Sequence, residues 1–180
     1  MEENFIFAGF GGQGVLLAGK ILATAFMLEE KNVTWYPCYG AEMRGGTVNC
    51  EIVVSNDEVS SVHKSDVDYL IVLNQLSFDR FIGKVKSGGT IIANSSLVKE
   101  VKPRSDIKYL FVPMTEIAQK LGETKTANIV SLGALASVCH QVTTDSIYKA
   151  LEHVLPEHRK NLLPLNLQAL KLGFNSLVVV

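Results

Sequence analysis

Cysteine patterns typical of disulfide frameworks and metal sites are missing from this sequence. The chain has only three cysteines, Cys38, Cys50 and Cys139, and none of them forms a C-x-x-C pair. An odd and scattered set of this kind argues against a disulfide framework and against a zinc or iron–sulfur site held by this chain alone. We therefore expect no metal ligands among its residues.

Strong charge and long apolar runs are also missing. The formal net charge is −1 at pH 7, which gives no basic footprint for nucleic acid. No stretch approaches the roughly 18 uninterrupted apolar residues of a membrane-spanning helix. The first apolar run lacks a basic n-region and is broken by glycines, so it does not resemble a signal peptide. We expect a cytoplasmic protein that binds neither nucleic acid nor the membrane.

What the sequence does contain is an alternation of strand and helix patterns. With 180 residues and 47% apolar content, we expect residues 1–180 to form one domain. Strands are expected at 4–8, 32–36, 47–55, 67–74, 88–96 and 107–114. Helices are expected at 15–28, 75–82, 115–121, 126–140, 143–155 and 156–173, the last bent at Pro164.

This order predicts an α/β fold: a three-layer α/β/α Rossmann-like domain with a mostly parallel sheet. The segments 4–8, 15–28 and 32–36 would form a strand–helix–strand unit with a right-handed crossover. The alternating segment 47–55 is typical of a half-buried strand, and the turn residues at 55–57 would lead into a short antiparallel partner at 58–62. The hairpin would be an insertion into the parallel sheet.

The stretch GFGGQG, from Gly9 to Gly14, lies between the first strand and the first helix. It satisfies G-x-G-x-x-G, and backbone N–H groups at such a strand-to-helix turn suit a phosphate or pyrophosphate. A tight turn without a ligand is an equally good interpretation of the isolated motif.

A classical NAD site needs a further residue that this sequence lacks. An acidic side chain should end the second strand and hold the ribose hydroxyls. Here that strand runs into Tyr36, Pro37 and Cys38, while Glu29 and Glu30 precede it. The G-K-[ST] ending of a P-loop is absent too, since Val15 follows Gly14.

A second unusual loop, YPCYGAEMRGG, spans 36–46. Loops that follow parallel strands share one rim of the sheet, so this loop should approach the glycine loop and segments 74–75 and 94–96. Arg44 could pair with a phosphate or carboxylate, and Tyr36 and Tyr39 could stack on a ring. The same residue types are enriched in protein interfaces, and both uses remain open.

Taken together, FAGFGGQGV, YPCYGAEMRGGTVNCEIVVS and DYLIVLNQ resemble the gamma subunit of 2-oxoacid:ferredoxin oxidoreductases. The likeness covers nearly the whole chain, extends to NIVSLGALASV, and is closest to the 2-oxoglutarate and branched-chain type. The equivalent unit in single-chain pyruvate:ferredoxin oxidoreductase is its gamma domain. Such complexes oxidatively decarboxylate a 2-oxoacid, reduce ferredoxin and transfer the acyl group to coenzyme A.

The resemblance implies a subunit without catalytic residues of its own. Thiamine diphosphate would lie on alpha and beta subunits and the iron–sulfur clusters on a ferredoxin-like delta subunit, with ferredoxin as the electron acceptor. This chain would support assembly and help to bind coenzyme A, whose pyrophosphate suits a glycine loop. The candidate contacts are Gly9, Gly11, Gly12, Gln13, Gly14, Arg44 and Asn74. The alternatives are a self-sufficient NAD- or FAD-dependent Rossmann oxidoreductase and a purely structural scaffold subunit.

Overall fold

A seven-stranded sheet forms the centre of the fold, in a computed structural model that describes residues 2–39, 46–59, 61, 63–101, 103–176 and 178–179. The strands are β1 (Glu2–Phe10), β2 (Asn32–Tyr39), β3 (Thr47–Ser55), β4 (Val67–Val72), β5 (Val85–Asn94), β6 (Lys108–Val112) and β7 (Val178–Val179), in the spatial order β2-β3-β1-β4-β5-β6-β7. The helices are α1 (Val15–Leu28), α2 (Gln75–Phe81), α3 (Met114–Lys120), α4 (Ala127–Ala136), α5 (Thr144–Val154) and α6 (Leu163–Asn175). The short 3-10 helices are η1 (Ile82–Lys84), η2 (Thr124–Thr126) and η3 (Glu157–Leu162).

Five of the seven strands run in the same direction. The neighbours β1, β4, β5 and β6 pair in parallel. Strand β3 is antiparallel to both β1 and β2, which makes β1 and β2 parallel to each other, and β7 is antiparallel to β6. The predicted α/β fold with a mostly parallel sheet is therefore confirmed.

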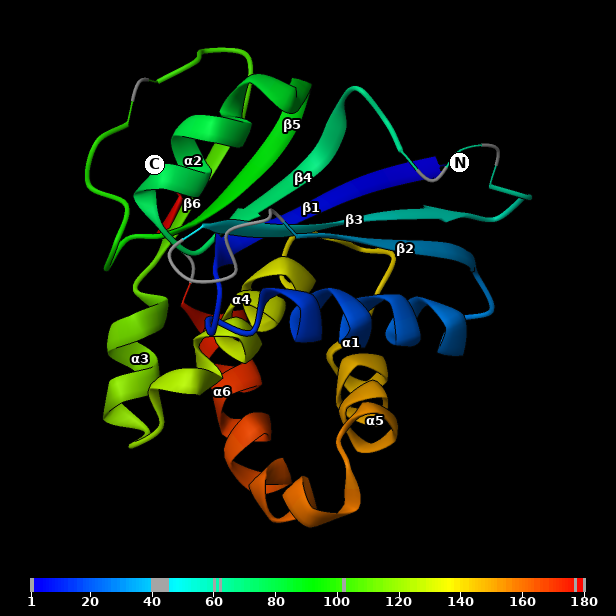
Figure 1. The fold of residues 1–180 in the computed structure, drawn as a ribbon, viewed down its shortest axis with the longest axis vertical. Coiled ribbons are helices and arrows are strands. Elements are labelled where there is room, and N and C mark those ends of the chain that lie inside the picture. The colour runs from blue at the N-terminus through cyan, green and yellow to red at the C-terminus, as the bar shows by residue number, and fades with distance from the viewer. Residues whose placement is uncertain are drawn as a thin grey trace.

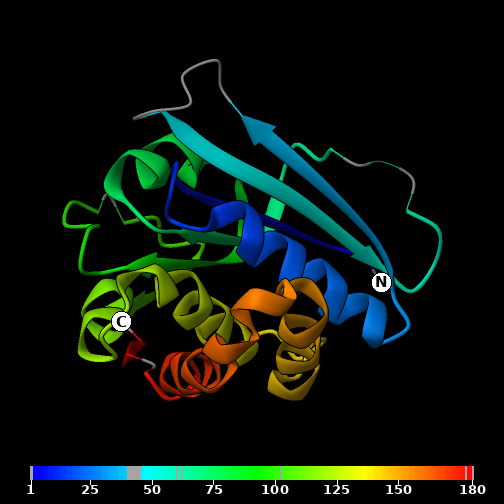
Figure 2. The same cartoon turned by 60° about the horizontal axis from the view of Figure 1, so that its bottom comes forward.

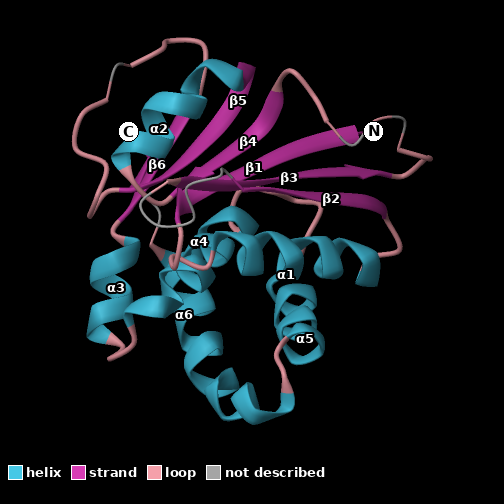
Figure 3. Ribbon diagram, viewed as in Figure 1, coloured by secondary structure: helices cyan, strands magenta, loops and turns pink. Residues whose placement is uncertain are grey.

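The helices cover the two faces of the sheet unequally. Helix α2 lies on one face, whereas α1, α3, α4, α5 and α6 lie on the other (Figures 1 and 3). Helix α5 packs against α1 and α6 packs against α4 (Figure 2). The sheet residues alternate accordingly: Phe5 and Phe7 belong to the core facing α1, while Ile6 and Ala8 belong to the core facing α2.

The antiparallel part of the sheet is not the hairpin expected after Ser55. Glu58, Val59 and Ser61 are not in a strand, and residues 60 and 62 lie outside the described ranges. Instead, β3 inserts between β1 and β2, and nearly all of its residues are buried on both faces, where a half-buried strand was expected. The buried polar side chains of β3 find partners in long cationic side chains. Arg80 donates a hydrogen bond to Thr47, and the Lys84 ammonium lies 3.5 Å from Glu51 Oε1.

One detail near the C-terminal end also differs from expectation. Pro164 does not bend a long helix; it lies in the first turn of α6, where its missing N–H has no helical partner to lose. The apolar end of the chain adds β7 to the edge of the sheet beside β6. Among the described residues, no helix combines the length and apolar character needed to span a membrane.

Candidate functional site at the glycine loop

The loop between β1 and α1 has a backbone that requires glycine. Gly12 and Gly14 have φ values of +93° and +75°, in the left-handed region that other L-residues rarely adopt. A Cβ at Gly14 would overlap the amide of Asn128, which donates a hydrogen bond of 3.1 Å to the Gly14 carbonyl. A Cβ at Gly12 would meet nothing within 4 Å, so the outer side of Gly12 is open for a ligand.

Gln13 turns its side chain back into the loop. Its Oε1 accepts hydrogen bonds from the Phe10 backbone N–H at 2.7 Å and from Asn74 Nδ2 at 2.9 Å. Asn74 in turn caps α2, because its Oδ1 accepts from the Ser77 N–H at 2.9 Å. Two of the predicted site residues are thus brought together, but their side chains hold the loop rather than point outward.

The remaining predicted residues divide into three groups. Gly9 is buried, and a Cβ there would meet the side chains of Val15 and Gln13 at 2.7 and 2.8 Å, so it serves close packing. Gly11 is exposed, like Gly12. Arg44, with the rest of 40–45, lies outside the described residues, and its predicted contact with ligand or partner stays a prediction.

Two pockets meet at the glycine loop. The first, here called the rim pocket, has a volume of about 210 Å³ and lies at the carboxyl ends of β1, β4 and β5. It is lined by Gly12, Gln13, Leu73, Asn94, Leu97, Thr115, Thr124, Lys125 and Ala127. The loops after β1, β4 and β5 therefore converge as predicted. The loop after β2 was predicted to join them, but most of it lies outside the described residues.

The second pocket, here called the helix pocket, lies between the loop and the helices below the sheet, with a volume of about 350 Å³. It is lined by Gly12, Gly14, Leu17, Glu123, Lys125, Thr126, Asn128, Ile129, Leu151, Leu155, Arg159, Leu162 and Asn166. Gly12 and Lys125 line both pockets. Within the described part of the chain, neither Lys125 nor Arg159 forms an ion pair.

Asn94 holds the rim pocket open at the end of β5. Its side chain is 1% exposed and donates to the Leu73 carbonyl at 3.2 Å and to Thr115 Oγ1 at 2.8 Å. Its Oδ1 accepts from the Thr115 N–H at 3.3 Å. These bonds tie the ends of β4 and β5 to the start of α3, so the rim pocket has a fixed polar floor.

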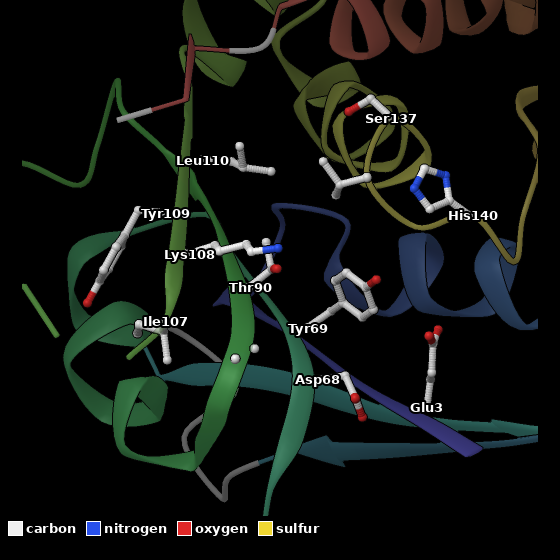
Figure 4. A pocket seen from close by; sticks show the side chains of 13 residues that line it. Glu3, Asp68, Tyr69, Thr90, Ile107, Lys108, Tyr109, Leu110, Ser137 and His140 are labelled. Carbon is white, nitrogen blue, oxygen red and sulfur yellow. The ribbon is translucent and has the colours of Figure 1, made fainter. Parts of the chain in front are cut away.

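A third pocket, of about 500 Å³, lies at the opposite ends of the strands (Figure 4). Figure 4 shows Glu3, Asp68, Tyr69, Lys108 and His140 around it, from the starts of β1, β4 and β6 and from the segment after α4. Asp68 is already engaged, because it accepts from the Asn4 N–H and pairs with Lys86. The glycines that line it, Gly88 and Gly89, belong to β5 and not to a strand-to-helix turn, so this pocket is not the candidate phosphate site.

The cysteines do not form a reactive centre. Burial raises the pKa of the Cys50 and Cys139 thiols to about 12. Burial, with the nearby Glu51 carboxylate, also raises the pKa of Cys38. These thiols therefore stay protonated near neutral pH and are poor nucleophiles. In the ranges that the structure describes, no group of three or more His, Cys, Asp or Glu residues is placed to hold a metal ion.

The sequence-based reasoning missed four residues of the site: Lys125, Asn128, Arg159 and Asn166. They come from segments more than a hundred residues after the glycine loop. Only Asn128 carried a signal in the sequence, since it is a polar residue at the start of an apolar helix pattern. Single basic residues in exposed segments, such as Lys125 and Arg159, have no pattern that marks them.

Comparison with known proteins gives one family. The family model described as pyruvate ferredoxin/flavodoxin oxidoreductase matches residues 4–176. The ketoisovalerate oxidoreductase subunit VorA of Methanothermobacter thermautotrophicus is 36% identical, over 96% of this chain but only 36% of its own length. The 2-oxoglutarate synthase subunit KorC of Methanocaldococcus jannaschii is 34% identical, over 91% of this chain and 90% of its own length.

Solved structures show the same fold. The gamma subunit of a keto/oxoacid ferredoxin oxidoreductase from Geobacter sulfurreducens has a TM-score of 0.86 and 29% identity, covering 98% of this chain and 96% of its own. The 2-oxoglutarate:ferredoxin oxidoreductase from Magnetococcus marinus, solved with 2-oxoglutarate, coenzyme A and succinyl-CoA bound, has a TM-score of 0.87. At 19% identity, with 96% of this chain and 30% of that one covered, it shares the fold alone.

Proposed function

Because this chain belongs to the pyruvate ferredoxin/flavodoxin oxidoreductase family, we propose that it is the gamma subunit of a multisubunit 2-oxoacid:ferredoxin oxidoreductase. The subunit relative KorC, which the chain matches over nearly its whole length, supports this architecture. VorA, of which the chain spans about a third, carries the same unit within a longer polypeptide. The complex would oxidatively decarboxylate a 2-oxoacid, reduce ferredoxin and form an acyl-CoA.

The contribution of this chain would be assembly and coenzyme A binding. The observation that carries this proposal is the glycine loop, where Gly12 faces open space at the junction of two pockets and Lys125 lines both of them. Backbone N–H groups at the start of α1 and a nearby cation suit a pyrophosphate. The backbone of Gly11 to Gly14 would make these contacts, while the side chains of Gln13 and Asn74 would hold the loop in shape.

Thiamine diphosphate and iron–sulfur clusters would lie on alpha, beta and delta partner subunits, with ferredoxin as the acceptor. The chain's three scattered cysteines support this assignment. A 2-oxoglutarate or branched-chain substrate is favoured by the names of the relatives. The 1–180 unit would act as one domain within the complex, and its cytoplasmic location stays a prediction of the sequence.

The alternative of a self-sufficient NAD enzyme has less support. Strand β2, from Asn32 to Tyr39, contains no Asp or Glu that could hold the ribose hydroxyls. Titration of the purified chain with NADH, FAD and coenzyme A tests this directly. Tight NADH or FAD binding together with weak coenzyme A binding would reverse the order of the two proposals.

Reconstitution tests the proposed function itself. The chain alone should not oxidise 2-oxoglutarate, pyruvate or 2-oxoisovalerate, and should carry no iron–sulfur chromophore. Co-expressed with the thiamine-binding and ferredoxin-like subunits, it should restore ferredoxin reduction that depends on coenzyme A and on one of these 2-oxoacids. Turnover by the chain alone, or full activity of the complex without it, would contradict the proposal.

A further inference from the structure

The third pocket lies at the ends of the strands opposite the glycine loop and plays no part in the proposed coenzyme A site. Its volume of about 500 Å³ exceeds that of the rim and helix pockets and lies within the range of roughly 300–1,000 Å³ for ligand sites. A Cβ at Gly88, one of its lining residues, would meet nothing within 4 Å, so the start of β5 leaves this space open.

A row of register partners crosses the sheet beneath the third pocket. The partners on β1, β4, β5 and β6 are, in order, Phe5, Tyr69, Thr90 and Lys108. Because they are neighbours in register, their side chains point to the same face of the sheet. Phe5 stacks on Tyr69 with ring centroids 5.0 Å apart and so holds the Tyr69 ring in place. Glu3 lies two residues before Phe5 on β1 and therefore shares this face.

One charge of each sign in this pocket has no counter-ion among the described residues. The carboxylate of Asp68 is already engaged, because it pairs with Lys86. Glu3 receives only a weak donor, the Cys139 thiol, whose Sγ lies 3.8 Å from Glu3 Oε2. Neither Glu3 nor Lys108 forms an ion pair within the described ranges. The pocket therefore offers one anion and one cation to a ligand.

These two charges reach the pocket from opposite sides. Strands β1 and β6 are three strand spacings apart, or about 14 Å. Figure 4 shows Lys108 extending from β6 toward Tyr69, with Glu3 and His140 beyond the Tyr69 ring. The segment that follows α4 brings Cys139 to Glu3, and the carbonyl end of a helix favours a cation. A ligand ammonium group therefore fits at Glu3 and a ligand carboxylate at Lys108.

Tyr69 lies between the two charges and remains an uncharged hydrogen-bond donor. Burial is the main reason why the pKa of Tyr69 is raised above its ordinary value of 10, and the nearby Cys139 thiol and Glu3 carboxylate add to the effect. Its hydroxyl group is therefore protonated at neutral pH and can donate to a carboxylate.

The rest of the ligand would meet an apolar wall. Leu110 belongs to the core that faces α1, and Val138 packs against that core. Both residues line the third pocket. A ligand that carries both charges and an apolar side chain matches this combination, because each of its parts has a partner of its own kind.

We propose that the third pocket binds a small zwitterion with an apolar side chain, of the class of the apolar α-amino acids. Glu3 binds the ammonium group. Lys108 and the Thr90 hydroxyl bind the carboxylate, while Leu110 and Val138 contact the side chain. This inference does not depend on the proposed function, because the third pocket and the glycine loop lie at opposite ends of the strands.

The test is an NMR titration of the full chain with free leucine and with two analogues that each lack one charge. The analogue 4-methylpentanoate lacks the ammonium group, and 3-methylbutylamine lacks the carboxylate. Leucine should shift the amide signals of Tyr69 and Thr90 saturably. Each analogue should bind about three- to tenfold more weakly, the scale of one partly exposed charged contact. Glycine should also bind more weakly, because it lacks the apolar side chain.

Two variants separate the roles of the charges. Glu3→Gln should remove the preference for leucine over 4-methylpentanoate and keep the preference over 3-methylbutylamine. Lys108→Met should do the reverse, because it removes the cation and keeps an unbranched apolar stem. The same spectra show whether each variant is folded, so a loss of affinity is measured only on a native chain.

Two residues outside the pocket lining provide matched controls. Glu2→Gln changes the carboxylate next to Glu3, which pairs with Lys64, and Lys120→Met changes an exposed lysine on α3. Both should bind leucine and its analogues as the wild type does. The proposal would be overturned if leucine left the Tyr69 and Thr90 signals unmoved or if the wild type bound leucine and both analogues equally. It would also be overturned if Glu3→Gln or Lys108→Met weakened all three ligands by the same factor.

Discussion

Gln13 illustrates how one residue of the glycine motif serves the loop rather than a ligand. Its Oε1 satisfies the Phe10 N–H and also receives Asn74, the residue that caps α2. The loop after β1 and the loop after β4 are therefore joined through a single acceptor atom. Because both carry candidate ligand contacts, the shape of the site depends on this side chain.

Removing the Gln13 side chain should destabilise the fold. Gln13→Ala leaves the Phe10 N–H and the Asn74 amide without their acceptor, at an expected cost of about 1–2 kcal/mol in the free energy of unfolding. Urea unfolding measures this quantity. Because Asn74→Ala breaks one of the same bonds, the double variant should lose about 1 kcal/mol less than the sum of the single variants. Strict additivity would show that the two side chains are not coupled.

At the scale of elements, local patterns were the reliable guide. The strand–glycine–helix order at 4–28 and the helix expected at 143–155, which is α5, were predictable because both depend on neighbours in sequence. The insertion of β3 between β1 and β2 was not, since strand order depends on contacts across the fold. Lys125 and Arg159 were missed for the same reason: only the folded chain brings η2 and η3 to the glycine loop.

Helices α4 and α6 meet at two glycines. A Cβ on Gly173 would overlap the Val130 carbonyl, and one on Gly133 would overlap the Leu170 carbonyl. Gly173→Ala should therefore lower the free energy of unfolding by about 1–3 kcal/mol, the usual cost of overpacking. Gly83→Ala is the control, because nothing lies within 4 Å of its Cβ position, and it should be neutral or slightly stabilising. A Gly173→Ala chain as stable as the control would refute this close approach.

Glu29 ties the end of α1 to the start of α5. Its carboxylate accepts from Ser146 Oγ at 2.5 Å and Thr143 Oγ1 at 3.2 Å, and the Ser146 hydrogen bond is the main reason why the pKa of Glu29 is lowered from its ordinary value of 4.5. A lowered pKa in the folded state adds stability above pH 4.5 that is lost as the pH falls through the folded value.

Glu29→Gln should therefore be less stable than the wild type at pH 7, by about 0.5–1 kcal/mol because the site is partly exposed. The difference should be smaller near pH 3, because the stability that the charged carboxylate contributes is lost as the pH falls below 4.5 and through the lowered pKa of the folded state. Urea unfolding at the two pH values measures it. Glu30→Gln, at the exposed neighbouring residue, should show no such pH-dependent difference. An equal deficit of Glu29→Gln at both pH values would contradict the role of the charged carboxylate.

At the scale of the whole molecule, the carboxyl ends of the strands and several helices on the more heavily covered face of the sheet meet at the glycine loop. The sheet directs the ends of β1, β4 and β5 to the rim pocket, and α1, α4, α5 and α6 build the helix pocket beside it. The site therefore depends on the complete fold. Under the proposed function, the chain would contribute a coenzyme A site to a complex whose partner subunits would carry the thiamine and iron–sulfur chemistry.

The most direct measurement is titration of the assembled complex with coenzyme A, comparing the wild type with Gly12→Val. Valine at a φ of +93° strains the loop and places a branched side chain on its open side, so coenzyme A affinity should fall by more than about tenfold. Gly83→Val, at a residue that lines neither pocket, should bind like the wild type. Unchanged coenzyme A affinity in a correctly assembled Gly12→Val complex would contradict the account and favour a purely structural subunit.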